Sequence, residues 1–135
     1  MVGTNAVAVL MIETDLPIPM TCAEGTGIPK GTVLRLIDPF TVEASAANED
    51  VFGGIAAEEK IASDGKATIA VYRGGIFKCE AGVGGVTVGL PIGIIAANNF
   101  TDFATLDDEK GAIFGVALET AADAQFFLME LGRNS

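Results

Sequence analysis

The sequence contains no histidine, and its other reactive or aromatic residues are few. Its 135 residues include two cysteines, one tyrosine and no tryptophan. Histidine is the commonest general base, nucleophile activator and metal ligand, so its absence leaves an enzyme only carboxylates, lysines or a thiol. Cys22 and Cys79 are far apart in the chain and have no histidine partner, which argues against a zinc site or a Cys–His nucleophile. We therefore expect no enzyme activity, no metal site and no cofactor.

Positive charge is also scarce. Lys and Arg number 8 against 18 Asp and Glu, which gives a net charge of −10. Such a surface repels phosphate backbones and anionic lipid headgroups, so neither nucleic acid nor a membrane is an expected partner. The apolar run at residues 6–12 is too short to span a bilayer, and no basic residue precedes it as in a secretion signal. Without that signal, reduced and buried thiols are favoured over a disulfide.

Glycine and aliphatic residues are abundant, and two stretches of the chain resemble each other. The sequence has 17 glycines and is 50% hydrophobic, which suits short strands joined by tight turns and bulges. Residues 51–58, a polar break and residues 67–74 have the same order of residue types as residues 113–119, a break and residues 125–132. We predict an internal duplication of a strand–turn–strand unit within a mainly β fold, either a small single-domain β-barrel or a β-sandwich.

Five glycines mark predicted turns or bulges in these units. The pair Gly53-Gly54 suggests a bulge or a close approach of two backbones, and Gly115 holds the matching place after Phe in the second unit. The pair Gly74-Gly75 is either a two-residue hairpin turn or a bulge in one long bent strand. The bulge is favoured, because it would place Arg73 and Lys78 on a common exposed rim.

The first 26 residues are predicted to precede the β-domain. Residues 6–12 alternate as in a strand covered on both faces, with Val7, Val9 and Met11 on one face. Pro17 and Pro19 cannot donate ladder hydrogen bonds, so regular pairing is not expected between residues 16 and 20. We therefore divide the chain into an N-terminal arm with its connecting loop, residues 1–26, and a β-domain, residues 27–135. The strand at residues 6–12 is either the first strand of the domain's own sheet or an arm that pairs with a neighbouring protein.

The glycine and apolar pattern between about Ile28 and Leu131 resembles the small head decoration, or capsid cement, proteins of tailed viruses. Four segments, residues 31–34, 51–56, 69–77 and 113–118, carry this resemblance. It implies a structural virion protein of a bacteriophage that binds the outer surface of the capsid and stabilises the major capsid protein lattice, as a homotrimer. It also implies synthesis in the host cytoplasm and contact with the capsid through an N-terminal arm, here Val7, Val9 and Met11. On this interpretation, removal of residues 1–16 leaves the β-domain folded.

Two other functions are weighed against this one. A virion surface module that binds host glycans or receptors needs an exposed aromatic platform, for which Tyr72 is the only Tyr or Trp in the chain. An enzyme could use Glu58 and Glu119 as a carboxylate pair, but their equivalent places in the two repeats favour a structural role. The remaining acidic clusters lack the alternating ligands and central glycine of a calcium loop, and we expect them to be solvated.

Overall fold

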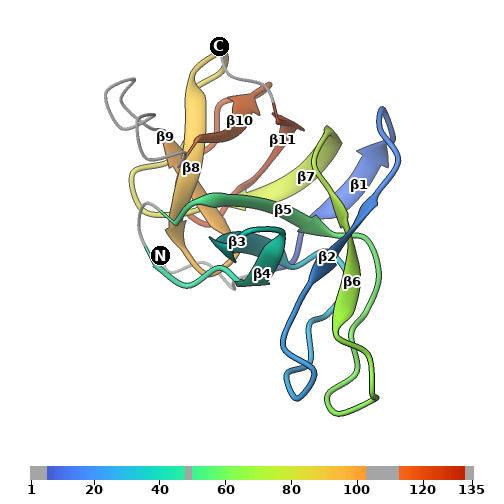
Figure 1. The fold of residues 1–135 in the computed structure, drawn as a ribbon. Helices are drawn as coiled ribbons and strands as arrows, with labels where there is room; N and C mark the ends of the chain where they lie inside the picture. Colours follow the sequence, from blue (N-terminus) through green and yellow to red (C-terminus); the bar gives the residue numbers. More distant parts are fainter. Residues whose placement is uncertain (1–5, 48–49, 103–112, 133–135) are drawn as a thin grey trace.

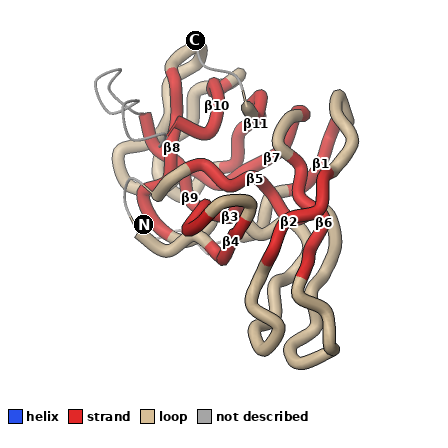
Figure 2. Tube along the Cα trace, viewed as in Figure 1, coloured by secondary structure: helices blue, strands red, loops and turns tan. Residues whose placement is uncertain are grey.

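The computed structural model describes residues 6–47, 50–102 and 113–132, which form β-strands joined by turns and loops (Figures 1 and 2). Within these ranges there is no helix with the length and apolar character needed to span a membrane. The strands are β1 (Val9–Ile12), β2 (Ile18–Thr21), β3 (Val33–Asp38), β4 (Thr41–Ala44), β5 (Phe52–Ala56), β6 (Thr68–Tyr72), β7 (Gly75–Ala81), β8 (Pro91–Ala96), β9 (Asn99–Asp102), β10 (Ile113–Ala117) and β11 (Phe126–Leu131).

The strands build two closed barrels that follow one another in the chain. The first barrel has the order β2-β4-β3-β5-β6, and the second has the order β7-β9-β8-β10-β11. Adding five to each strand number in the order of the first barrel gives the strand order of the second barrel. Each barrel is closed by one parallel contact, which places Thr21 opposite Thr41 in the first and Glu80 opposite Asn99 in the second. The predicted duplication is therefore present, and it covers five strands per unit rather than two.

The two barrels also share details of backbone structure. A two-way bridge joins Ile28 to Lys60 in the first barrel, and Val86 to Ala121 in the second. The β3–β4 turn has Phe40 at φ +49°, and the β8–β9 turn has Asn98 at φ +59°. These matches fix which residues are equivalent between the barrels. A residue in one barrel can therefore be compared with its equivalent in the other, which shows whether the fold requires that residue type.

Strand β1 belongs to neither repeat. It pairs antiparallel with β7 of the second barrel, with Val9 opposite Lys78 and Leu10 opposite Phe77 (Figure 1). Of the two interpretations of residues 6–12, the strand of the protein's own sheet is the one observed. We expected both faces of β1 to be covered. The structure covers them only in part, because Val9 and Met11 remain more than half exposed.

The prolines do not prevent pairing of β2, which differs from the expectation. Pro19 lies opposite Ala70 of β6 in a regular antiparallel ladder. The backbone groups of Ala70 are used on the β5 side, where its carbonyl accepts the Ala57 N–H and its N–H donates to Glu58. The Pro19 nitrogen therefore faces away from β6. On that side no ladder hydrogen bond to β6 needs an N–H, so the proline does not disturb the pairing. The structure thus places β2 inside the first barrel, and the predicted boundary at residue 26 falls between two strands of that barrel.

The predicted turn glycines have different roles. Gly74-Gly75 is neither a hairpin turn nor a bulge within one strand, because β6 and β7 belong to different barrels. Gly74 lies in the short connection between these strands, and Gly75 is the first residue of β7. Gly53 and Gly54 lie at a register shift between β3 and β5, and a Cβ on Gly53 would stand 2.8 Å from the Leu34 carbonyl oxygen. A Cβ on Gly115 would collide with the carbonyl oxygen of Glu130 on the neighbouring strand.

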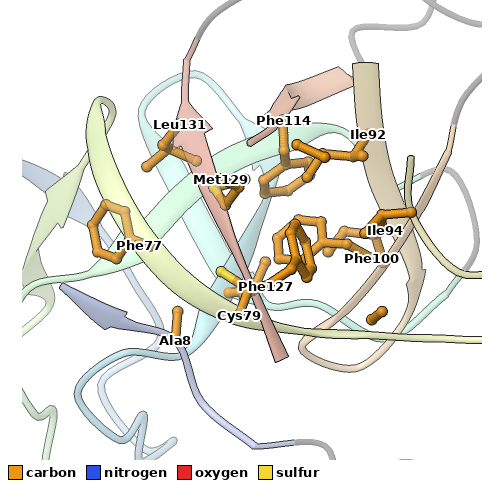
Figure 3. Packing of buried hydrophobic residues seen from close by; sticks show 14 of the residues in the cluster. Ala8, Phe77, Cys79, Ile92, Ile94, Phe100, Phe114, Phe127, Met129 and Leu131 are labelled. Carbon is orange, nitrogen blue, oxygen red and sulfur yellow. The ribbon is translucent and has the colours of Figure 1, made fainter. Parts of the chain in front are cut away.

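Each barrel has a core, and the second core reaches into the first barrel. Phenylalanines from four strands fill the second barrel, with ring centroids of Phe100 and Phe114 5.5 Å apart (Figure 3). Val33 and Ile55 of the first barrel belong to the same cluster. At this junction the Asn98 side-chain oxygen accepts the Val33 N–H at 2.9 Å, and the Asn98 N–H donates to Ser45 Oγ at 3.1 Å. The two barrels are therefore joined by packing and by hydrogen bonds.

Candidate interaction surface

Two of the three predicted contact residues are exposed on β1. Val9 and Met11 are 52% and 53% exposed, whereas Leu10 between them packs against the core of the second barrel. The two-residue period of the strand is interrupted after Leu10, because the register against β7 shifts there and Ile12, which is 55% exposed, lies opposite Ile76. Val7 precedes the strand, is half-buried and lines a cavity beside it. Val9 lines the same cavity, whereas Met11 is not among its lining residues. The three predicted contact residues therefore do not form one row along β1.

The register of the sheet connects Val9 with side chains on three further strands. Val9 lies opposite Lys78, and Lys78 lies opposite Leu128. Leu118, at the end of β10, donates its N–H to the Leu128 carbonyl at 2.8 Å and so completes the row. Side chains directly opposite each other in a ladder point to the same side of the sheet. We call the outward apolar side chains of this row, together with Met11 of β1, the apolar face: Val9, Met11, Leu118, Phe126 and Leu128, around Lys78. By the same register, Glu80 and Glu130 also belong to this side of the sheet.

Large side chains on this face remain open to solvent in the single chain. Phe126 is 49% exposed and Leu118 is 37% exposed. The Lys78 ammonium lies 5.3 Å from the Phe126 ring centroid, where it makes a cation–π contact. Exposed apolar residues grouped beside a lysine are typical of a surface that binds another protein.

The first barrel shows that the fold does not require an apolar face. Equivalent positions are fixed by matching bonds: Ala57 N–H donates to the Ala70 carbonyl as Leu118 N–H donates to the Leu128 carbonyl. The large side chains of the second barrel are replaced by small or polar ones at these positions, with Ala57 for Leu118, Ala70 for Leu128, Thr68 for Phe126 and Pro19 for Lys78. The same change continues into the loop before β8, where Val88 and Leu90 correspond to Lys30 and Thr32.

The strand edges of the two barrels also differ, and again the second barrel is the one better suited to bind another protein. In the first barrel, Pro17 and Pro19 stand along the outer edge of β2, and proline at an edge hinders pairing with another strand. In the second barrel the matching edge of β7 is occupied by β1, and β1 is then itself the end of the sheet. Residues 6–12 contain no proline and no charge. The second barrel therefore combines an unprotected edge with an apolar face.

A cavity of about 410 Å³ lies beside β1 at the junction of the two barrels. Its walls are mostly apolar, and Lys30 is the charged residue among them. The lining residues are Val7, Ala8, Val9, Leu10, Lys30, Gly31, Ala56, Tyr72 and Phe77.

The predicted carboxylate pair serves two separate structural roles. Glu58 accepts the Ala70 N–H at 2.9 Å in the first barrel, and Glu119 accepts the Leu128 N–H at 2.9 Å in the second. Each carboxylate thus caps the facing strand of its own repeat. Among the residues that the structure describes, no three His, Cys, Asp or Glu side chains form a group that could hold a metal ion. Of the acidic clusters, residues 107–109 lie outside the described ranges.

The two cysteines are free thiols in separate cores, Cys22 in the first barrel and Cys79 in the second. Burial raises the pKa of both thiols, and the effect on Cys79 is the larger. Neither thiol therefore has the exposed, anionic character of a reactive cysteine.

One cation, Lys60, was not singled out by the sequence, and another, Arg73, was expected on an exposed rim with Lys78 but is half-buried. Lys60 is 3% exposed, and its ammonium donates to the carbonyls of Glu24 and Ile61 and pairs with Asp64 at 2.7 Å. These bonds hold together the two long loops that extend beyond β2 and β6 (Figure 2). Arg73 lies at the junction of the barrels. The sequence signal for Lys60 was its place beside Ile61 in an otherwise polar loop, but its burial depends on contacts 36 residues away along the chain.

The fold resembles a solved phage structure. Neither a protein-family model nor a curated protein sequence matches the chain. A crystal structure of the head fiber gp8.5 N base in bacteriophage phi29 superposes with a TM-score of 0.54, at 14% sequence identity, over 90% of this chain and 94% of that one. At this level of identity the similarity establishes a shared fold.

Proposed function

We propose that this protein is a structural component of a bacteriophage virion that binds the outer surface of the capsid and stabilises the major capsid protein lattice. The observation that carries the proposal is the apolar face, because the fold itself tolerates small and polar residues at the same positions in the first barrel. The shared fold with a phage head fiber base supports placing this surface against a capsid. The resemblance to head decoration proteins supports the same assignment.

The proposed contact uses Val9 and Met11 together with Leu118, Phe126 and Leu128. Burying such side chains on a partner removes apolar surface from water, which favours association. A protein that binds only the mature lattice stabilises it by mass action, by about 2.7 kcal/mol per site when its free concentration is 100-fold above Kd. Assembly as a homotrimer would add avidity, since one bound subunit holds the other two near their sites.

Recognition of host glycans gains no support from Tyr72, the only Tyr or Trp in the chain. Tyr72 is half-buried, its hydroxyl donates to Glu13 at 2.9 Å, and its ring packs edge-on against Phe77. The exposed surface that a stacked sugar needs is therefore reduced.

Quantitative mass spectrometry of purified particles tests the virion assignment. We expect a ratio to the major capsid protein near one to one if the protein covers the lattice. A few copies per particle would indicate a vertex or tail component, and absence from particles would refute the virion role.

A substitution on the apolar face tests the contact. Met11→Asp places a charge in the proposed interface and should weaken binding to heads assembled without the protein by tenfold or more, about 1.4 kcal/mol. Ile61→Asp is the matched control, because Ile61 is 56% exposed on a loop of the first barrel. Equal binding by both variants, with unfolding midpoints like that of the wild type, would exclude the apolar face as the contact.

A further inference from the structure

Arg73 lies where the two barrels meet, and its side chain has a fixed direction. The guanidinium carbon lies 4.3 Å from the centroid of the Phe52 ring. Phe52 in turn packs edge-on against Phe114 of the second barrel, with ring centroids 4.9 Å apart. The backbone is held as well, because a Cβ on Gly132 would collide with the Arg73 carbonyl oxygen. The guanidinium is therefore a positioned group at the junction and not a flexible surface chain.

This guanidinium has no anionic partner among the described residues. Arg35 pairs with both Glu43 and Asp50, and Lys60 pairs with Asp64, but no ion pair or side-chain hydrogen bond includes Arg73. Asp15 packs its carboxylate against the neighbouring Gly74 without pairing with Arg73. Burial lowers the pKa of Arg73, and no opposite charge counters that effect. Arginine stays protonated in proteins, so the half-buried site retains a positive charge with unused donors.

The repeat shows that the fold does not need a cation here. Tyr72 lies opposite Ile55 as Glu130 lies opposite Val116, so the next residues, Arg73 and Leu131, are equivalent. Leu131 is 3% exposed and belongs to the core of the second barrel. An apolar residue therefore satisfies this position of the barrel, whereas an unpaired cation is partly removed from water, which is unfavourable.

We propose that Arg73 is an anchor for a carboxylate side chain of the capsid protein that this chain binds. The inference rests on the proposed capsid-binding function and adds a polar contact to it. A guanidinium is a planar fork of donors that matches a carboxylate in two parallel hydrogen bonds, and its contact with the Phe52 ring holds it at the junction. A polyphosphate ligand fits less well, because the net charge of −10 repels a polyanion, whereas one carboxylate on a partner surface adds a single charge.

Binding of Arg73 variants to heads assembled without the protein tests the anchor. Arg73→Gln should weaken binding by about tenfold or more, and Arg73→Lys should fall between this variant and the wild type, because lysine keeps the charge but loses the fork. Lys66→Gln is the matched control, since it makes the same change in net charge on an exposed loop. Arg73→Gln should also bind with less dependence on salt than the wild type. Equal affinities for Arg73→Gln and Lys66→Gln would overturn the inference.

A second measurement separates this inference from the proposed function. If the wild-type protein fails to bind heads, the proposed function is lost, but the anchor can be tested alone by NMR. The Nε–H resonance of Arg73 should shift on addition of acetate, at lower concentration than on addition of inorganic phosphate, while that of the paired Arg35 stays in place. An Arg73 resonance that does not respond to acetate, or that responds only together with that of Arg35, would refute the anchor.

Discussion

Phe40 carries backbone strain that its counterpart in the second barrel avoids. Its φ of +49° lies in the left-handed region, which a bulky side chain rarely adopts, whereas Asn98 occupies the same turn position at +59°. Phe40 is also 63% exposed, so its ring gains little from burial. Phe40→Asn should therefore raise the free energy of unfolding by about 1 kcal/mol, measured by denaturant titration.

The reciprocal change provides the control. Asn98→Phe removes the side-chain oxygen that accepts the Val33 N–H and should lower the free energy of unfolding by about 2 kcal/mol. If Phe40→Asn were destabilising, the exposed ring would have to make contacts that the single chain does not show.

Gly115 is the position where an added methyl group should be most harmful among the predicted glycines. Its Cβ would collide with the Glu130 carbonyl oxygen, a backbone atom that pairing between β10 and β11 holds in place. Gly115→Ala should lower the free energy of unfolding by at least about 2 kcal/mol, seen as a lower denaturant midpoint. Gly25→Ala is the control, because the nearest atom to its Cβ is 3.9 Å away, and it should change stability by less than about 0.5 kcal/mol.

At the scale of elements, β1 should be needed for the fold, contrary to its interpretation as a detachable arm. Ala8 is 5% exposed, Leu10 packs on the second core, and the strand covers the edge of β7. Deletion of residues 1–16 would expose this core and an edge without prolines. We expect a lower thermal midpoint and concentration-dependent aggregation, measured by light scattering. A truncated protein with the wild-type midpoint would show that β1 contributes nothing to stability.

Only part of the repeat could be recognised from the sequence. The β5–β6 and β10–β11 units were recognisable from their shared order of residue types, but the match between the two Phe-Gly pairs was wrong by one residue. Gly115 corresponds to Gly54 and not to Gly53, because both lie close to a facing carbonyl, that of Glu130 and that of Tyr72. The other strands of the repeat were not recognisable, since a barrel strand needs only buried side chains of suitable volume, and turn pairs such as Phe40 and Asn98 have diverged. Alternation predicted that Val7, Val9 and Met11 share a face, but it could not reveal the register shift after Leu10 that interrupts the two-residue period. It gave no information on Leu118 or Phe126, because only the register between distant strands places them beside β1.

For the whole molecule, the shared core predicts that the two barrels unfold together. Val33 and Ile55 pack in the cluster of the second barrel, and Phe52 packs edge-on against Phe114 across the junction. The wild type should therefore show one thermal transition, with calorimetric and van't Hoff enthalpies equal. Two resolved transitions would mean that the junction is too weak to couple the barrels.

Phe52→Ala should weaken this coupling more than a comparable change within one barrel. It removes the ring that Phe114 and Arg73 both contact, and a loss of about 3 kcal/mol is expected. Ile69→Ala is the matched control, because Ile69 is 1% exposed and lies in the core of the first barrel alone. We expect Phe52→Ala to broaden or split the calorimetric transition, so that the van't Hoff enthalpy falls below the calorimetric value. Ile69→Ala should lower the midpoint while the chain still unfolds in one step. Only Phe52→Ala removes a side chain that contacts both barrels. The same broadening in both variants would therefore indicate that cooperativity depends on total stability and not on the junction.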